Sequence, residues 1–351
     1  AAASYSYDGS EATMRQEESG HYYKLYNNSG AKAEFTVTLA GEGVPYQMHT
    51  WDGTVEPIAA YTKTEDGVTL DVTIPTDDML VIAVAPADGE VAAAAGFAGG
   101  ESVSVLEEAA AEGAGDFGGF AFSFDSGTTD EAVVSETEAK YVSNQLVLRA
   151  TESGTYNVTT GSGEVLTVEA SEPKQAPDLY TWTLTLNSYG PDEEANKIDP
   201  TISEITTVVI DNVATGTVWA YLPTSYAEEL GVDNMDAISG TGVYTTTISM
   251  PEDWDSTVDG AYLALTYCEN DMLAAVTVNG ESITDLNALR DYVDLGHLLQ
   301  AGDNEITIKI DTTLVNRGQY EGGQTKTVSD QRVDDGLLTA ELIAYTDTVI
   351  A

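Results

Sequence analysis

Alternation of apolar and polar residues dominates the chain and is clearest between Ser239 and Arg317. Alternate side chains of a strand point to opposite faces of its sheet, so this period of two predicts strands with one buried face. Asn279-Gly280 lies between two such strands and predicts a tight hairpin. The inward rows are Tyr244, Thr246, Ile248 and Met250, then Leu263 and Leu265, then Val276 and Val278, and finally Ile306, Ile308 and Ile310. We interpret the stretch as half of an antiparallel sandwich.

The first half of the chain contains shorter alternating runs. Rows such as Phe35, Val37 and Leu39 predict the hairpins of a small sandwich. Residues 86–138 are rich in Ala, Gly and Glu and predict a long connection with one short helix near Leu106 to Glu112. Strands are expected again at Gln145 to Arg149, Thr155 to Thr159 and Val165 to Val168. The polar, Pro-containing run Ser171 to Pro177 is typical of a linker.

Beyond this linker the pattern predicts a second sandwich. Strands are expected at Leu179 to Leu186, Ile205 to Val213 and Gly336 to Tyr345. Thr224-Ser225 with Glu228 has the spacing of a capping box before a short helix at Tyr226 to Leu230. The halves share no repeat that can be aligned. The prediction is an all-β protein of two antiparallel β-sandwiches, residues 1–172 and 178–351, with the Ala/Gly-rich connection inside the first.

Composition agrees with a folded protein but adds an unusual charge. The 351 residues include 59 Asp and Glu and only 13 Lys and Arg, a formal net charge of -46. Such a charge repels phosphate backbones and anionic lipid, so nucleic acid is excluded as a partner and membrane insertion is not expected. It is typical of a solvated surface on a secreted or salt-exposed protein. The chain begins with Ala1 rather than Met, which suggests that it is part of a longer polypeptide.

The usual signatures of catalysis are missing from the sequence. The three histidines are far apart, and no zinc, Walker, dinucleotide or G-x-S-x-G motif appears. Neighbouring carboxylates do not identify the acid and base of a glycosidase, because the chain contains 59 Asp and Glu residues. The single cysteine, Cys268, follows an apolar run and is interpreted as a core residue. We therefore expect no enzymatic activity from this chain alone and assign no catalytic residue.

Carbohydrate binding remains as candidate chemistry, because sugar rings stack on exposed aromatic faces beside hydrogen-bonding groups. Trp51 and Trp219 lie in or beside loops and are candidates for stacking, with core packing as the alternative. Arg290, Asn316 and Arg317 are candidates for hydrogen bonds to sugar hydroxyls. An arginine in so acidic a chain could instead pair with a local carboxylate.

Several segments, in their order along the chain, resemble a known family. They are Ser239 to Thr247, Val276 to Gly280, Val293 to Asn304 and Leu314 to Arg317. Together they resemble the galactose-binding-like jelly roll of the glycoside hydrolase family 2 superfamily, in the form found at the C-terminal end of family 106 α-L-rhamnosidases. Tyr22 to Asn28 and Trp51 to Pro57 look like the sandwich that precedes it in those enzymes. Here Ile283 to Arg290 lacks the Trp- and Pro-rich motif that approaches the sugar in the family.

The resemblance implies a non-catalytic accessory region of a secreted or cell-surface bacterial glycoside hydrolase. Its partners would be the upstream catalytic barrel of the same polypeptide, carbohydrate, or both. Jelly rolls of this kind commonly bind structural Ca²⁺, for which acidic loops would supply oxygen ligands, although no spacing matches an EF-hand. Two alternatives stay open: an autonomous carbohydrate-binding module, and an adhesin-like structural protein without a sugar ligand.

Overall fold

The computed structural model describes residues 10–65, 67–97, 103–108, 137–191, 202–287, 289–320 and 333–350. The chain forms two compact units. Unit 1 comprises Ala1–Lys174, Thr257–Gly260 and Ala344–Ala351, and unit 2 comprises Gln175–Ser256 and Ala261–Ile343. Two short segments from the second half therefore belong to unit 1. The predicted sandwiches at residues 1–172 and 178–351 stay a prediction.

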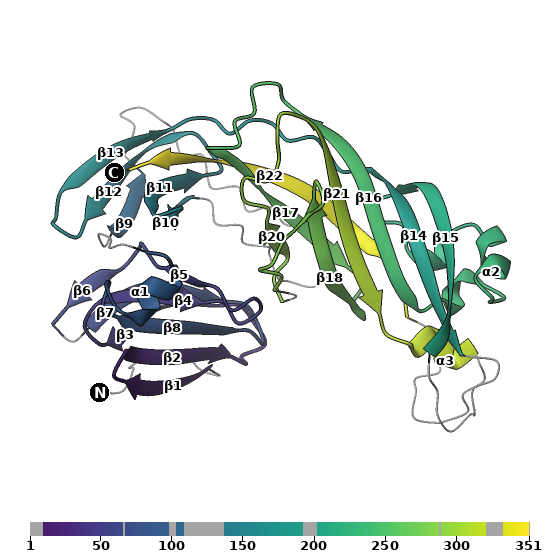
Figure 1. The fold of residues 1–351 in the computed structure, drawn as a ribbon, viewed down its shortest axis with the longest axis horizontal. Helices are drawn as coiled ribbons and strands as arrows, with labels where there is room; N and C mark the ends of the chain where they lie inside the picture. Colours follow the sequence, from purple (N-terminus) through teal and green to yellow (C-terminus); the bar gives the residue numbers. More distant parts are fainter. Residues whose placement is uncertain are drawn as a thin grey trace. The chain divides into compact units, whose positions relative to one another are not determined.

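Unit 1 begins with two antiparallel sheets that enclose an apolar core (Figure 1). Buried rows such as Val37 and Leu39 supply this core, and they are the rows that the alternation predicted. The first sheet has the order β1-β2-β8-β4-β5 and the second β3-β7-β6. The strands are β1 (Ser10–Glu17), β2 (Gly20–Asn27), β3 (Ala33–Ala40), β4 (Val44–Met48), β5 (Val55–Pro57), β6 (Thr62–Thr64), β7 (Gly67–Ile74) and β8 (Met79–Ala85).

A second apolar core of unit 1 forms around Leu148 and Val158. One sheet has the order β13-β12-β9. In the other, β10 pairs with β11, and β11 pairs with the last residues of β22. The strands are β9 (Val103–Glu108), β10 (Thr137–Val142), β11 (Gln145–Ala150), β12 (Gly154–Thr160) and β13 (Val165–Ala170). The helix predicted near Leu106 to Glu112 is wrong at its start, because residues 106–108 lie in β9 and pair with β12. Residues 109–112 lie outside the described residues.

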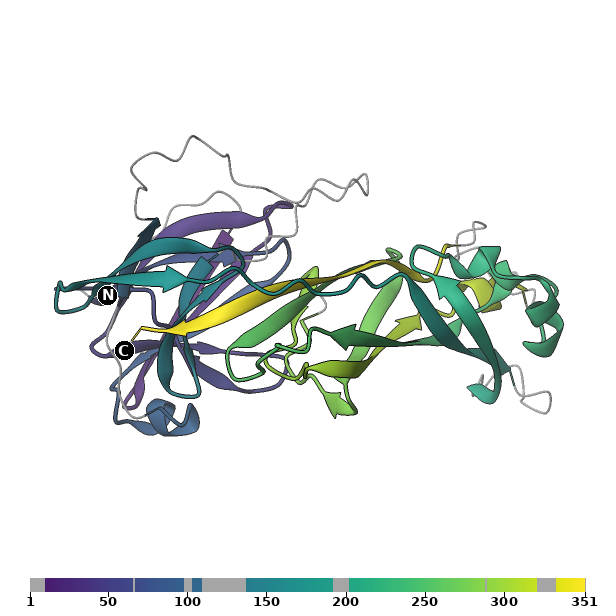
Figure 2. The same ribbon diagram turned by 90° about the horizontal axis from the view of Figure 1, so that it is seen from above.

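Unit 2 consists of two sheets whose inner faces bury the predicted apolar rows (Figures 1 and 2). The larger has the order β15-β14-β16-β21-β18-β19, and β22, β17 and β20 are neighbours in the other. The strands are β14 (Thr181–Pro191), β15 (Ile202–Ala214), β16 (Gly240–Met250), β17 (Asp259–Tyr267), β18 (Asp271–Val278), β19 (Glu281–Ser282), β20 (Tyr292–Asp294), β21 (Gly302–Thr312) and β22 (Leu337–Val349). The pairings of β14 with β15 and β16, of β21 with β16 and β18, and of β17 with β20 are antiparallel. The predicted all-β fold of antiparallel sandwiches is therefore confirmed.

The helices are short and lie between strands. They are α1 (Glu90–Ala94), η1 (Trp219–Tyr221), α2 (Ser225–Glu229), η2 (Met235–Ala237) and α3 (Val315–Tyr320). The predicted helix after Thr224 is confirmed as α2, but the Thr224 side chain makes no capping hydrogen bond. Among the described residues, no helix has the length and apolar character needed to cross a membrane.

Candidate functional site

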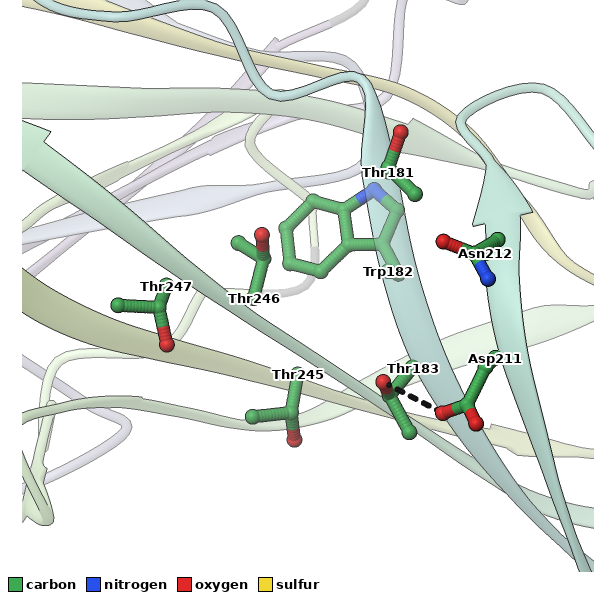
Figure 3. Close-up of a pocket in the computed structure, with 8 residues that line it drawn as sticks. All are labelled: Thr181, Trp182, Thr183, Asp211, Asn212, Thr245, Thr246 and Thr247. Carbon is green, nitrogen blue, oxygen red and sulfur yellow. Dashed lines mark hydrogen bonds between the residues drawn. The ribbon is translucent and has the colours of Figure 1, made fainter.

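A shallow groove of about 360 Å³ lies against three strands of the larger sheet of unit 2 (Figure 3). Strands β14, β15 and β16 form its floor. Its lining consists of hydroxyl and amide groups with one carboxylate: Thr181, Trp182, Thr183, Asp211, Asn212, Thr245, Thr246 and Thr247. Trp182 is only 1% exposed, so nearly all of the groups that a ligand in the groove could contact belong to the polar side chains.

A β-bulge shapes one side of the groove. The register of β14 and β15 shifts between Trp182 and Leu184, so β15 has an extra residue there. Asn212 adopts a left-handed conformation with φ 59° at this bulge, which a short polar side chain tolerates better than most. Asp211 beside it accepts a hydrogen bond from Thr183 Oγ1 at 3.1 Å, as the dashed line in Figure 3 shows. The bulge therefore turns an amide and a carboxylate toward the threonines of β14.

Hydroxyl groups continue across the sheet from this point. Thr183 lies opposite Thr245, Thr245 opposite Thr307, and Thr307 opposite Thr277. The Thr245 and Thr307 hydroxyls are 3.2 Å apart. Rows of hydroxyls with an amide and one carboxylate can exchange hydrogen bonds with a neutral polyhydroxylated ligand. Asp211 is the only charged group of the lining, so the groove disfavours phosphate and sulfate.

Two of the five predicted carbohydrate-binding residues are buried. Trp219 is 1% exposed and donates a hydrogen bond from Nε1 to the Tyr244 hydroxyl at 2.6 Å. Asn316 is 2% exposed and donates to Val333 O and Asp335 Oδ2, both at 2.8 Å. The burial of Trp219 favours core packing over stacking, and Asn316 fastens α3 to the segment before β22.

The two predicted arginines contact their own surroundings. Arg317 Nη1 donates to the Leu230 carbonyl at 3.5 Å, and its guanidinium carbon is 5.6 Å from the centre of the Tyr320 ring. Arg290 Nη1 lies 3.9 Å from an oxygen of Asp285. Arg290 therefore lies near a carboxylate, as the local-pairing alternative expects, whereas these two contacts of Arg317 are to a carbonyl and an aromatic ring.

Trp51 differs from Trp219 because half of its surface is accessible. It is 52% exposed and lies in the loop between β4 and β5 of unit 1. The backbone of this loop is tied by hydrogen bonds between His49 and Thr54, and Asp52 accepts from the Thr54 amide at 2.8 Å. The Trp51 ring is thus displayed on an ordered turn, which lowers the entropy lost when a ligand stacks on it.

The five predicted residues are divided between the two units. Trp51 belongs to unit 1 and the other four to unit 2. Sequence reasoning also missed the groove, although a signal was present: threonine alternates on β14 as Thr181, Thr183 and Thr185. The alternation indicates one shared face, but the neighbouring strands follow only from the sheet order β15-β14-β16.

Metal and nucleophile chemistry have little support in the described part of the chain. It contains no group of three or more His, Cys, Asp or Glu side chains that could hold a metal ion. Structural Ca²⁺ therefore stays a prediction. Cys268 is buried, and burial raises the pKa of its thiol to about 12, so the reactive thiolate is scarce at neutral pH.

Comparisons with known proteins point to one class of fold. No family model matches the chain, and no curated protein does. Among solved structures, a rhamnosidase from Novosphingobium sp. PP1Y matches with a TM-score of 0.52 and 14% identity, over 98% of this chain and 24% of the rhamnosidase. A beta-glucuronidase from Faecalibacterium prausnitzii has a TM-score of 0.31 and 14% identity, over 51% of this chain and 32% of that one.

The match to the rhamnosidase concerns the fold. At 14% identity it shows that the β architecture is like that of part of a glycoside hydrolase chain. The present chain spans about a quarter of the length of that rhamnosidase. The TM-score of the beta-glucuronidase is too low to carry an argument.

Proposed function

We propose that this chain is a non-catalytic β-sandwich region of a secreted bacterial glycoside hydrolase of the α-L-rhamnosidase type. Its role would be to support the catalytic domain of the same polypeptide and to contact carbohydrate. The observation that carries the proposal is the extent of the fold likeness: 98% of this chain corresponds to only 24% of the rhamnosidase. A region of that size with no catalytic constellation among its described residues suits an accessory role.

The carboxyl groups with clearly raised pKa values also argue against catalysis in this chain. Burial is the main cause for both Asp271 and Asp335, which are 9% and 3% exposed. A glycosidase needs its acid and its second carboxylate on either side of an accessible sugar linkage. These two groups are enclosed instead.

Carbohydrate contact is supported by two accessible features. The exposed Trp51 ring offers a stacking face, and the groove of Thr183, Asp211 and Thr245 offers hydrogen-bonding groups for hydroxyls. The groove also favours the second candidate function, an autonomous carbohydrate-binding module, because it needs no other domain to be complete.

The test combines a hydrolysis assay with a binding assay on the 351-residue chain. We expect no release of p-nitrophenol from p-nitrophenyl α-L-rhamnopyranoside. We expect retardation in gels that contain rhamnose-rich polysaccharide, with Trp51→Ala weakening the apparent affinity about 3- to 10-fold, since ring stacking contributes about 0.5–1.5 kcal/mol. Asp211→Ala tests the groove separately. Tyr221→Ala is a control, because it removes another highly exposed ring, 79% accessible, from outside both features.

Each outcome separates the candidates. Hydrolysis by the chain itself would refute the non-catalytic role. Binding that depends on Asp211 but not on Trp51 would favour the autonomous module. An absence of binding to every polysaccharide tested would remove carbohydrate contact and leave the supporting role. That role predicts that a polypeptide with the catalytic domain unfolds at a lower temperature when this region is deleted.

A further inference from the structure

Two buried carboxyl groups lie close together in unit 2, because Asp271 accepts a hydrogen bond from the amide of Gly336, the residue that follows Asp335. Asp271 is the first residue of β18, and Asp335 lies two residues before β22. Asp271 is 9% exposed and Asp335 is 3% exposed. Removing a carboxylate from water is unfavourable unless it gains a positive partner or enough hydrogen-bond donors. Within the described residues, neither of these two groups forms an ion pair.

Each carboxyl has one oxygen that is satisfied and one that is not. Asp271 Oδ2 accepts from the Gly336 amide at 2.7 Å, and Asp335 Oδ2 accepts from Asn316 Nδ2 at 2.8 Å. The other oxygen of each, Oδ1, is buried and has no donor among the described residues. Two carboxylates can only accept hydrogen bonds, so they cannot satisfy one another unless one of them carries a proton.

We propose that Asp271 holds a proton and donates it to Asp335, so that the pair shares one proton and one negative charge. This hydrogen bond joins three parts of unit 2. Asp271 holds Gly336 at the start of β22, and Asp335 holds Asn316 of α3. The shared proton therefore stabilises the contacts between β18, α3 and the start of β22, and this stabilisation depends on pH.

The directions of the pKa shifts agree with this arrangement. The pKa of Asp271 is raised to about 8; burial is the largest cause, the Gly336 amide lowers the pKa, and the hydrogen bond to Asp335 also raises it. Burial also raises the pKa of Asp335, to about 6, whereas accepting from Asp271 lowers it. Asp271 is accordingly the member of the pair that keeps the proton.

The neighbouring groups do not titrate in the same range. Tyr244 of β16 and Cys268 between β17 and β18 both have pKa values raised to about 12, chiefly by burial. Burial likewise raises the pKa of Tyr267 above its ordinary value of 10. Asp334 adds a further negative charge beside Asp335. Because these tyrosine and cysteine side chains titrate at higher pH, we assign a proton that is lost between pH 6 and 8 in this region to the Asp271–Asp335 pair.

The sign of the effect on stability follows from the raised pKa values. An aspartate of the unfolded chain has a pKa near 3.8, so the folded state binds the proton more tightly. The stabilisation by the proton is complete below about pH 4. It declines as the pH rises and is lost above about pH 8, where two like charges lie together in a buried position.

Asp271→Asn is the decisive variant, because its amide permanently replaces the shared proton. The asparagine oxygen can still accept from Gly336, while its NH₂ group donates to Asp335. Trp182, Trp219 and Trp254 are buried in unit 2, so a Trp51→Phe background makes tryptophan fluorescence a report on this unit alone. Asp303→Asn, at an exposed position of β21, removes the same charge elsewhere and is the matched control.

We expect the urea midpoint of the parent to fall between pH 6 and 9 and that of Asp271→Asn to stay nearly level and higher at pH 9. The urea midpoint of the Asp303→Asn control should fall with pH as that of the parent does. In ¹³C spectra of aspartate carboxyls, one resonance should titrate above pH 6 and vanish in Asp271→Asn. The proposal is overturned if all carboxyls titrate below pH 5. It is also overturned if Ca²⁺ raises the midpoint of the parent but not of the variant, which would make the pair a cation site.

Discussion

Arg149 and Asp347 form a buried ion pair in unit 1. The two residues lie opposite each other in β11 and β22, and two hydrogen bonds of 2.8 Å join the guanidinium to the carboxylate. Their side chains are 3% and 4% exposed, and the Tyr345 ring lies 3.7 Å from the guanidinium carbon. The pair therefore ties the last strand of the chain to β11.

Replacing Arg149 alone should destabilise unit 1. Arg149→Met leaves the Asp347 carboxylate buried without its cation, so we expect a loss of about 3–5 kcal/mol in the free energy of unfolding. Urea denaturation followed by circular dichroism measures the loss, and hydrogen exchange of β11 assigns it to unit 1. Lys63→Met, on an exposed strand, should change stability by less than about 0.5 kcal/mol. The double variant Arg149→Met with Asp347→Leu should regain part of the lost free energy of unfolding. If it regains none, the unpaired buried carboxylate is not the cause of the loss.

The sequence predicted the candidate site only in part at the level of single residues. The sequence identifies Trp51 and Trp219 as aromatic residues near loops but cannot say which ring stays accessible. The difference depends on Tyr244, whose hydroxyl accepts from Trp219 and from the Leu337 amide. Trp219 and Leu337 lie 25 and 93 residues from Tyr244 in the sequence, and no local pattern of residues encodes such a contact.

The hairpin between β18 and β19 shows a turn whose side chain also joins another strand. Asn279 and Gly280 have φ values of 53° and 80°, as the Asn-Gly pair predicted. Asn279 Nδ2 donates to Asn304 Oδ1 at 2.9 Å, and its own Oδ1 accepts from the Glu305 amide at 3.0 Å. The turn is therefore bonded to the start of β21.

Variants of this turn separate backbone strain from side-chain contacts. Gly280→Ala meets no atom within 4 Å, so only the left-handed conformation should lower stability, by about 1–2 kcal/mol. Asn279→Gly keeps the conformation but deletes the bonds to β21, and we expect a loss of about 1–3 kcal/mol. Urea unfolding of unit 2 measures both. A double-mutant cycle with Asn304→Ala should give a coupling above about 0.5 kcal/mol, and additive losses would contradict the bond.

Elements were easier to predict than their arrangement. Period-two alternation located β16, β18 and β21 because each has one buried face. It failed at β9, where Val103 to Glu108 precedes an Ala- and Glu-rich run that favours helix, and pairing with β12 overrides the local preference. The sequence did not predict the order of the strands in the sheets, since β14 pairs with β16 across an intervening strand and three short helices.

For the whole molecule, the charge of -46 is the property that sequence alone settles. The 13 cationic residues can neutralise few of the 59 carboxylates, and several already pair locally, as Lys32 does with Glu34 and Lys309 with Asp311. The folded state brings the remaining negative charges closer together than the unfolded chain does. Self-repulsion should therefore lower its stability.

Screening should relieve this repulsion. The Debye length falls from about 30 Å at 0.01 M salt to about 10 Å at 0.1 M, so we expect the thermal midpoint to rise as NaCl increases over that range. Asp303→Lys, at an exposed position, should raise the midpoint in 0.01 M NaCl because it weakens the same repulsion. Most of that gain should disappear in 0.2 M NaCl. A midpoint that is constant or falls with added salt would mean that surface charge does not limit the stability of this protein, and that its acidity serves solubility alone.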